Sequence, residues 1–304
     1  MFSPVSGLVV FVNEKSGRGR ARWLLDRLRE REARLHHAVV VSASTADSAR
    51  EELSSALDAR PERVVIFGGD GTTHLVANKV LERGQGRDVT LGIVPAGTGS
   101  DFARGLRIPR VIFRAIARAL DGAPEPVDAL RVETDAGARR YAINVASAGI
   151  SGMVDEAVNA VRKRGTISYL AATLGALRRY RNVPARVTVD GQQWHEGPML
   201  LLAAANGRTF GNGMRVAPHA SPHDGLIDVV LVRPVPTAQL VFRLPQIYLG
   251  THLRAPFVRF GHARQIRLEP LGAMPPLDLD GETMPAAAVT ITVEEGALRF
   301  AGAQ

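Results

Sequence analysis

In roughly the first 120 residues, short runs of apolar, β-branched residues alternate with segments whose apolar residues recur at helical spacing. The runs predict strands at 7–12, 38–41, 64–67 and 89–94. The segments between them predict helices at 21–35, 48–57 and 73–81. Strands separated by helices are typical of a parallel sheet that helices cover on both faces. We therefore predict a doubly wound parallel α/β domain in this part of the chain.

The pattern changes after a stretch rich in proline and glycine at Asp121–Pro126. Beyond it, alternating or continuous apolar runs predict strands at 129–133, 140–145, 185–189, 199–205, 227–232, 265–269 and 289–293. One helical segment, 166–180, interrupts them. So many short strands are typical of a β-sandwich. We expect one domain at 1–126, joined by the tail 295–304, and a β-sandwich domain at 127–294.

Composition narrows the class of protein. The chain has 304 residues, of which 45% are apolar, so it can bury two cores of ordinary size. Cysteine is absent, which excludes disulfide scaffolds, cysteine-ligated zinc and thiol nucleophiles. No apolar run approaches the roughly 18 to 20 residues of a spanning helix, and no basic region precedes the first apolar run. We expect a cytoplasmic protein with neither a spanning helix nor a signal peptide.

The chain is strongly basic, with a formal charge of +8 and only three lysines among its 38 basic residues. This field favours an anionic partner, which could be nucleic acid, an anionic membrane or a phosphorylated small molecule. Aromatic residues are only 5% of the chain, and no zinc or helix-turn-helix signature occurs. We therefore expect no nucleic-acid partner.

Two glycine-rich turns carry the candidate chemistry. Val64–Thr73 and Leu91–Arg104 each run from a predicted strand, through glycines, into a predicted helix. Glycines allow the backbone to approach phosphate oxygens, and a helix N-terminus favours negative charge. The carboxyl ends of parallel strands line one edge of a sheet, so both turns and the loop Asn13–Gly19 should converge. Three such turns at one edge indicate a nucleotide.

Two interpretations of Asp70 are open, because its carboxylate could lie near a phosphate-bound Mg²⁺ or could cap the helix. The common nucleotide fingerprints are missing. No G-x-x-x-x-G-K-[ST] sequence occurs, and the loop Gly17–Arg22 lacks the third small residue of a dinucleotide loop and the later acidic residue. A Walker-type ATPase and an NAD-dependent dehydrogenase are therefore disfavoured.

Gly68–Thr72 followed by Pro95–Ala103 resembles the diacylglycerol kinase catalytic-domain family, which includes bacterial lipid kinases and sphingosine kinases and is distantly related to NAD kinases. The glycine-aspartate turn is shared with NAD kinases, whereas the second motif is similar to the lipid-kinase form. Further matches follow in the family's order at Tyr141–Gly149, Thr188–Gly191, Ala217–Ala220, Asp224–Asp228 and Asp280–Glu282. Two positions depart from the pattern, Glu14 in place of a proline and Ser100 in place of an asparagine.

The resemblance implies a kinase that transfers the γ-phosphate of ATP, with Mg²⁺, to diacylglycerol or a similar lipid alcohol in a cleft between two domains. Asp70 would orient the Mg²⁺-bound phosphates, as a hard cation prefers oxygen ligands. The implied nucleotide-binding positions are Asn13, Ser16, Gly17, Thr45, Gly68, Gly69, Asp70, Gly71, Thr72, Thr73, Thr98 and Asp101.

Asp280 and Glu282 would supply the general base, and which of the two takes the proton stays open. The alternative is a β-turn whose acidic side chains only contact water. Asp224, with the carbonyls of Ser221 and Leu226, would bind a structural Mg²⁺, or would form an ordinary Asp-Gly turn. His219 and His223 are four apart, but Pro222 argues against a helical zinc pair.

Basic runs at 162–164 and 178–181 bracket the apolar segment 167–177. This segment could rest on an anionic bilayer at the inner membrane face, where a lipid substrate resides, or could be a solvated basic face. The resemblance also implies a homodimer. Two alternatives to a lipid kinase are an NAD-kinase-like enzyme with a soluble substrate and a catalytically silent nucleotide- or lipid-binding regulator. The intact Asp70, Asp280 and Glu282 count against the silent regulator.

Overall fold

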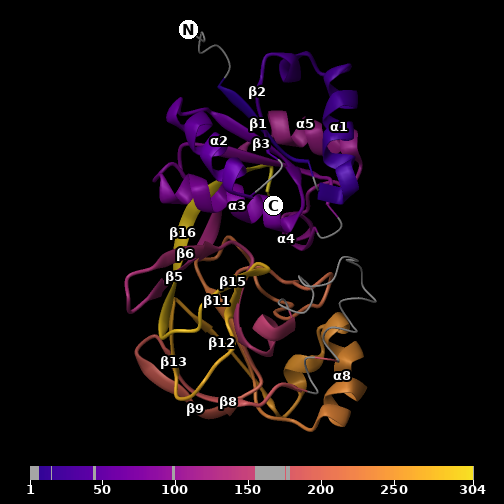
Figure 1. The fold of residues 1–304 in the computed structure, drawn as a ribbon. Coiled ribbons are helices and arrows are strands. Elements are labelled where there is room, and N and C mark those ends of the chain that lie inside the picture. Colours follow the sequence, from indigo (N-terminus) through magenta and orange to yellow (C-terminus); the bar gives the residue numbers. More distant parts are fainter. Residues whose placement is uncertain are drawn as a thin grey trace. The chain divides into compact units, whose positions relative to one another are not determined.

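The structure is a computed structural model that describes residues 7–14, 16–43, 46–97, 100–154, 175 and 179–303. The chain forms two compact units, labelled by element in Figure 1. The first unit is Met1–Val127 with Gly296–Gln304, and the second unit is Asp128–Glu295. The sequence places the corresponding boundaries at 126/127 and 294/295. Two strands, β5 and β16, carry the chain from one unit into the other.

The first unit is an α/β domain, as predicted. Its parallel strands lie in the order β2-β1-β3-β4, and Arg299 and Phe300 of β16 add a fifth strand parallel to β4. The elements in chain order are β1 (Leu8–Asn13), η1 (Ser16–Gly19), α1 (Arg20–Arg29), η2 (Ala33–His36), β2 (Val39–Ala43), α2 (Ala46–Asp58), β3 (Arg63–Gly68), α3 (Asp70–Glu82), β4 (Thr90–Pro95), α4 (Asp101–Gly105) and α5 (Ile112–Asp121).

The central strands of this sheet are buried on both faces, which explains why they read as continuous apolar runs. Helices α1 and α5 pack on one face, where Leu25 and Ile116 join the cluster of Val10 and Phe67. Helices α2 and α3 cover the other face (Figure 1).

The helix predicted at 21–35 is shorter in the structure. Helix α1 ends at Arg29, and the N–H groups of Arg31 and Glu32 both donate to the carbonyl of Leu28, at 3.0 and 2.9 Å. Leu35 is fully buried from the separate turn η2, so its helical spacing reflects burial rather than a continuous helix. Helix α4 is the helix expected after the second glycine-rich turn, whereas α5 was not among the predicted elements.

The second unit is a sandwich of two antiparallel sheets, which confirms the predicted class. Strands β16-β13-β8-β9 form one sheet, with β5 beside β16 and β6 beside β5, and β12-β11-β10-β7-β14-β15 form the other. The elements are β5 (Pro124–Thr134), β6 (Arg139–Ala142), β7 (Val145–Gly149), β8 (Val183–Val189), β9 (Gln192–Met199), β10 (Leu201–Ala205), β11 (Ile227–Val232), α8 (Thr237–Leu249), η3 (His252–Arg254), β12 (Val258–Ala263), β13 (Gln265–Pro270), β14 (Leu277–Leu279), β15 (Glu282–Met284) and β16 (Val289–Ala301).

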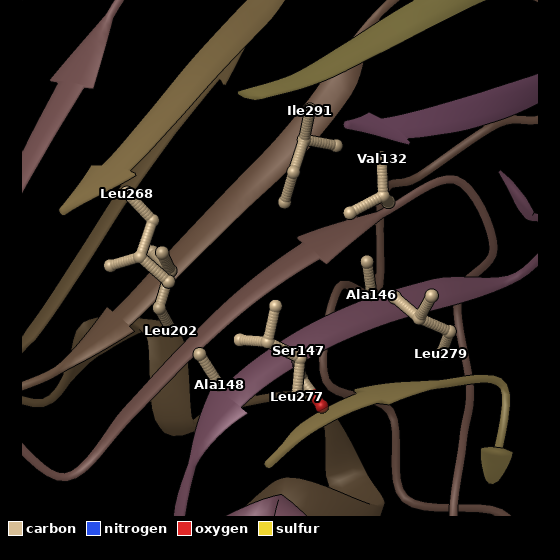
Figure 2. A pocket seen from close by; sticks show the side chains of 9 residues that line it. All are labelled: Val132, Ala146, Ser147, Ala148, Leu202, Leu268, Leu277, Leu279 and Ile291. Carbon is tan, nitrogen blue, oxygen red and sulfur yellow. The ribbon is translucent and has the colours of Figure 1, made fainter. Parts of the chain in front are cut away.

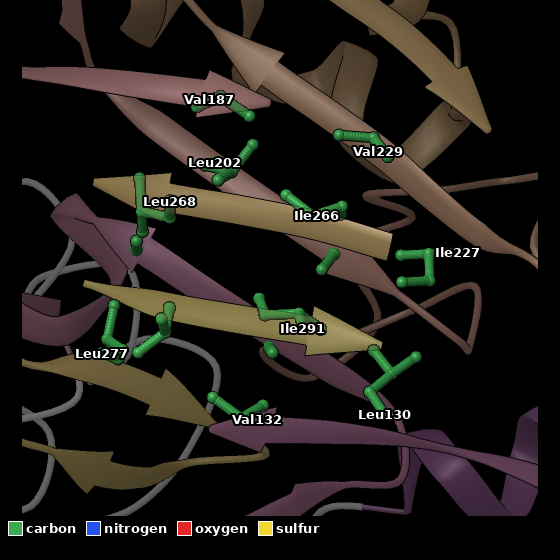
Figure 3. Close-up of a cluster of buried hydrophobic side chains, with 14 of the residues drawn as sticks. Leu130, Val132, Val187, Leu202, Ile227, Val229, Ile266, Leu268, Leu277 and Ile291 are labelled. Carbon is green, nitrogen blue, oxygen red and sulfur yellow. The ribbon is translucent and has the colours of Figure 1, made fainter. Parts of the chain in front are cut away.

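Alternating side chains of both sheets meet in one core. Figure 3 shows Ile266 and Ile291 from one sheet and Leu202 and Ile227 from the other within this cluster. Figure 2 shows the narrow space between the sheets, whose lining is apolar except for Ser147. The buried hydroxyl of Ser147 donates to the carboxylate of Asp278 at 3.0 Å. The interior of the sandwich is therefore a filled core.

Helix α8 corrects the prediction of a single helix among the strands. Pro245 lies inside it, and a proline within an apolar run argues against a helix from sequence alone. The predicted helix 166–180 and the basic segment around it lie almost entirely outside the described residues. Within the residues that the structure does describe, no helix is long and apolar enough to cross a membrane.

Candidate functional site

The turns that follow β1, β3 and β4 lie at the same edge of the parallel sheet. The register pairs Val12 with Phe67 and Gly68 with Pro95, so the three strands end at one level. The N–H groups of Ala96 and Gly97 both donate to the carbonyl of Gly68, at 2.9 and 3.3 Å. The turn after β4 is therefore tied to the end of β3.

The loop after β1 joins the same edge. The amide of Asn13 donates to the Thr72 hydroxyl at 3.2 Å. Gly17 has a φ of +59°, and a Cβ on it would lie 2.2 Å from the carbonyl oxygen of Ala96. Only glycine fits this close approach. The predicted convergence of the three turns is confirmed.

Asp70 links two helices of the first unit. It is the first residue of α3, and its carboxylate accepts hydrogen bonds from the N–H groups of Asp101 at 2.9 Å and Phe102 at 3.2 Å. Asp70 is therefore a helix cap, but it caps α4 rather than its own helix. Asp101 is buried and its carboxylate bonds to Arg104 at 2.8 Å.

The hydroxyls of the GGDGTT turn are engaged within the protein. Thr73 donates to the carbonyl of Gly69 at 3.1 Å, and Thr72 accepts from Asn13. A Cβ on Gly68 would lie 2.4 Å from that of Thr72, which explains this glycine by packing. Because Gly69 caps α3 without a side chain, the first-turn N–H groups of α3 are the donors that this turn offers to an anion.

The other nucleotide-binding positions divide into two sets. Ser16 and Gly17 lie in η1, and Gly71 is exposed in the first turn of α3. Thr45 and Thr98 lie outside the described residues, so their roles stay predictions of the resemblance.

Asp280 occupies a tight hairpin in the second unit. Asp280 and Gly281 have φ of 58° and 91°, the left-handed values of a two-residue turn between β14 and β15. The Asp280 carboxylate accepts the N–H groups of Ile143 at 2.7 Å, Asn144 at 3.0 Å and Val145 at 2.8 Å. These N–H groups bond to Asp280 at the break between β6 and β7, which explains why the single strand predicted at 140–145 is divided.

Glu282 stands two residues further on and differs from Asp280 in its surroundings. It begins β15 with an exposed side chain, and among the described residues its carboxylate makes no ion pair or hydrogen bond. Asp278 is buried on β14, where one oxygen accepts the N–H of Gly281 at 2.7 Å. Sequence reasoning did not single out Asp278, although an acid inside an apolar strand, two residues before Asp280, is a readable signal.

The loop of Asp224 is a compact turn. The Asp224 carboxylate accepts the N–H of Leu226 at 3.1 Å, and the buried Asp128 accepts the N–H of Gly225 at 2.8 Å. Across the residues that the structure covers, no three His, Cys, Asp or Glu side chains gather as metal ligands. A Mg²⁺ here would therefore depend on Asp224 together with carbonyls such as those of Ser221 and Leu226, which stays a prediction.

Asp228, near the start of β11, is a buried acid that belongs to a matched motif but to which the sequence assigned no role. Its Oδ1 finds no hydrogen-bond partner within the described part of the chain, and its Oδ2 lies 3.7 Å from Nδ1 of His262. Burial raises the pKa of Asp228 to about 6, and the positive charge of His262 opposes this rise. The readable signal was a single carboxylate within an apolar strand.

Comparison with known families accounts for both units. Residues 7–132 match the diacylglycerol kinase catalytic domain, and residues 144–302 match the YegS C-terminal NAD kinase beta sandwich-like domain. The chain belongs to the diacylglycerol kinase catalytic-domain family. As a member of this lipid kinase family, it carries the family's two domains in the order that the motifs predict.

Relatives in the diacylglycerol kinase family extend over most of this chain. The "Diacylglycerol kinase" of Mycobacterium tuberculosis is 31% identical over 78% of this chain and 77% of its own length. The "Probable lipid kinase YegS-like" of Stenotrophomonas maltophilia is 29% identical over 83% and 82%. The crystal structure of a diacylglycerol kinase from Bacillus anthracis has the same fold, with a TM-score of 0.71 at 19% identity, covering 97% of this chain and 96% of that one.

Proposed function

We propose that this lipid kinase transfers the γ-phosphate of ATP, with Mg²⁺, to the hydroxyl of diacylglycerol or a similar lipid alcohol. The observation that carries the proposal is the convergence of three glycine-bearing turns at one edge of the parallel sheet. That edge is where open α/β sheets bind ligands. Family membership supplies the reaction class, and the names of the relatives support the choice of acceptor.

The donor set at this edge fits a nucleotide phosphate. The first-turn N–H groups of α3 have no side-chain cap, and the threonine hydroxyls beside them are occupied within the protein. Backbone N–H groups and a helix N-terminus bind phosphate without needing a lysine. Asn13, Ser16 and Gly17 complete the proposed cradle from the β1 side.

The residues present also fit Mg²⁺. Asp70 places a carboxylate in the first turn of α3, held by its two hydrogen bonds to α4. Mg²⁺ prefers such oxygen ligands and usually retains several waters beside substrate phosphates. When bound, the ion would neutralise charge on the phosphates, and Asp70 would hold the phosphate-bound ion in register with α3 and α4.

Glu282 is the better candidate for the general base. The Asp280 carboxylate is engaged by three backbone N–H groups, whereas that of Glu282 is exposed. Glu282 would accept the proton of the lipid hydroxyl while the hydroxyl oxygen bonds to the γ-phosphorus. The bond from that phosphorus to the β–γ bridging oxygen breaks, and ADP leaves. Asp280 would position Glu282 by fixing the hairpin.

The test is transfer of labelled γ-phosphate from ATP to diacylglycerol, monoacylglycerol, ceramide and sphingosine in mixed micelles, with NAD as a soluble acceptor. Parallel reactions contain Mg²⁺ or excess EDTA. We expect label in a glycerolipid product, and only with Mg²⁺.

Label found only in NAD would mean that the acceptor is a soluble dinucleotide and not a lipid. Label in no acceptor would favour a catalytically silent nucleotide- or lipid-binding regulator. Transfer that continues in EDTA would show that the reaction does not require Mg²⁺ and would contradict the role assigned to Asp70.

A further inference from the structure

Helix α8 presents apolar side chains outward from the second unit. Ala238, Phe242, Pro245 and Leu249 are exposed at intervals of four, three and four residues, which places them on one helical face. Phe242 is 84% exposed and Leu249 is 68% exposed. Large apolar side chains gathered on one exposed face mark an interaction surface more often than scattered ones do.

The helix is held firmly in place. On its inner side Leu240 packs against the buried cluster that contains Ile150 and Val232. The N–H of Arg215 donates to the carbonyl of Ile247 at 3.0 Å. The helix ends at Gly250, whose φ of 73° allows its N–H to bond to the last turn. The outward face therefore belongs to an ordered, anchored helix.

The sequence on both sides of α8 is basic and contains no acidic residue. Residues 229–268 contain six arginines and neither aspartate nor glutamate. Arg233 and Arg254 are exposed just before and just after the helix. Arg243, on α8 itself, lies over the ring of Phe257 at 5.7 Å. An exposed apolar face with arginines beyond both ends of the helix suits an anionic membrane, where apolar side chains enter the headgroup region and basic side chains meet lipid phosphates.

We propose that α8 docks this protein on an anionic bilayer, with Phe242 and Leu249 entering the headgroup region and Arg233 and Arg254 contacting lipid phosphates. The inference rests on the proposed function, because a lipid acceptor brings the enzyme to a bilayer. A second copy of the chain is a poorer occupant. A two-fold contact over α8 would place arginines opposite arginines, with no carboxylate in residues 229–268 to pair them.

The experiment measures binding without catalysis. Full-length protein is sedimented, in the absence of ATP, with sucrose-loaded vesicles of phosphatidylcholine alone or with added phosphatidylglycerol. The variants are Phe242→Ser/Leu249→Ser and Arg233→Gln/Arg254→Gln. The matched control is Trp23→Ser, which removes an exposed aromatic side chain from α1 in the first unit. Circular dichroism and thermal melting show that each variant is folded.

We expect the wild-type protein to bind vesicles that contain phosphatidylglycerol and to lose this binding at high salt. Removing the two apolar side chains should weaken partitioning by about tenfold per residue. Removing the two arginines should weaken it by about fivefold per residue. Trp23→Ser should bind as the wild type does.

Three results would overturn the proposal. The first is unchanged partitioning of folded Phe242→Ser/Leu249→Ser. The second is equal, salt-insensitive binding to neutral and anionic vesicles. The third is a wild-type dimer in light scattering that becomes monomeric in this variant while vesicle binding is unchanged, which would assign the face to a second copy.

The result is separable from that of the proposed function. In detergent micelles, where the acceptor is dispersed, the α8 variants should transfer label at the wild-type rate, and on vesicles they should transfer it more slowly. If the wild type transfers no label in micelles but the variants partition as expected, the proposed function fails and the docking surface stands. If label is transferred and partitioning is unchanged, only the docking surface fails.

Discussion

Asp280 and Val145 exchange two hydrogen bonds: the Val145 N–H donates to the Asp280 carboxylate at 2.8 Å, and the Asp280 N–H donates to the Val145 carbonyl at 3.1 Å. The N–H groups of Ile143 and Asn144 bond to the same carboxylate. One side chain thus holds the break between β6 and β7 to the β14–β15 hairpin. Of the two acids at this hairpin, the Asp280 carboxylate is engaged by three backbone N–H groups, whereas that of Glu282 is exposed.

Asp280→Ala should destabilise the protein by about 3 kcal/mol, because it leaves three N–H groups without their charged acceptor. Asp280→Asn is the matched control. It keeps one acceptor oxygen and tolerates the left-handed turn, so its loss should be about 1 kcal/mol. Urea-induced unfolding measures both. An alanine variant as stable as the wild type would show that the three hydrogen bonds contribute nothing.

Glu282→Gln should lower kcat by about 100-fold or more while the KM for ATP stays unchanged, since it removes the proposed base and no binding contact. Its stability should stay within about 0.5 kcal/mol of the wild type because the side chain is exposed. Steady-state kinetics in micelles test the first point and thermal melting the second. An unchanged kcat would remove Glu282 as the base.

Asp70→Ala should abolish turnover and also cost about 1 kcal/mol, because α4 loses its cap. Asp70→Asn separates the two roles. Its amide oxygen can still accept an N–H of α4, so stability should largely recover, whereas the carboxylate that supports Mg²⁺ is gone. Kinetics at increasing Mg²⁺ and thermal melting distinguish them. Wild-type activity in the asparagine variant would contradict the role in Mg²⁺ chemistry.

Asp228 should make stability depend on pH. Its pKa is raised by burial from 3.8 to about 6, so the folded protein holds this proton more tightly than the unfolded chain does. The contribution to stability is therefore present below the unfolded value and is lost as pH rises towards 6. Asp228→Asn should be similar to the wild type near pH 4 and more stable above pH 6, by on the order of 2 kcal/mol.

Urea unfolding of both proteins across this range, in EDTA, gives the difference directly. His262→Gln is a useful companion variant, because the positive charge of His262 opposes the rise in the pKa of Asp228. A stability difference that does not vary between pH 4 and 7 would contradict the prediction.

Mg²⁺ should raise the melting temperature of the wild-type protein without nucleotide or lipid, because a ligand that binds only the folded state stabilises it. Asp224→Ala should lose this shift. Asp47→Asn, which removes an exposed carboxylate from α2, should keep it. Differential scanning calorimetry with and without the metal measures the effect. A full shift in Asp224→Ala would place the ion elsewhere.

The parts of the molecule that could be predicted from sequence depend on local patterns. The strands of the first unit are apolar runs, and their turns carry glycines at the strand ends. The meeting of these turns then follows from the geometry of a parallel sheet. The convergence of the loop after β1 with the turn after β4 follows in the same way, from the order of the strands.

The parts that could not be predicted depend on distant partners. The backbone N–H groups that donate to Asp70 belong to residues about 30 positions later in the chain. Those that donate to Asp280 belong to residues more than 130 positions earlier. No spacing rule connects such residues. Helix α8 was hidden for another reason, because apolar residues on its exposed face and Pro245 within it obscure the helical period.

Strand β16 imposes an order on folding during synthesis. Its last residues pair with Thr90 and Leu91, and the ring of Phe300 meets that of Phe102 at 5.4 Å. The sheet that begins with β1 therefore gains this strand only after Phe300 has been synthesised. The nascent chain must keep the outer side of β4 unpaired while about 200 further residues or more are made, and during that time this strand edge is prone to aggregation.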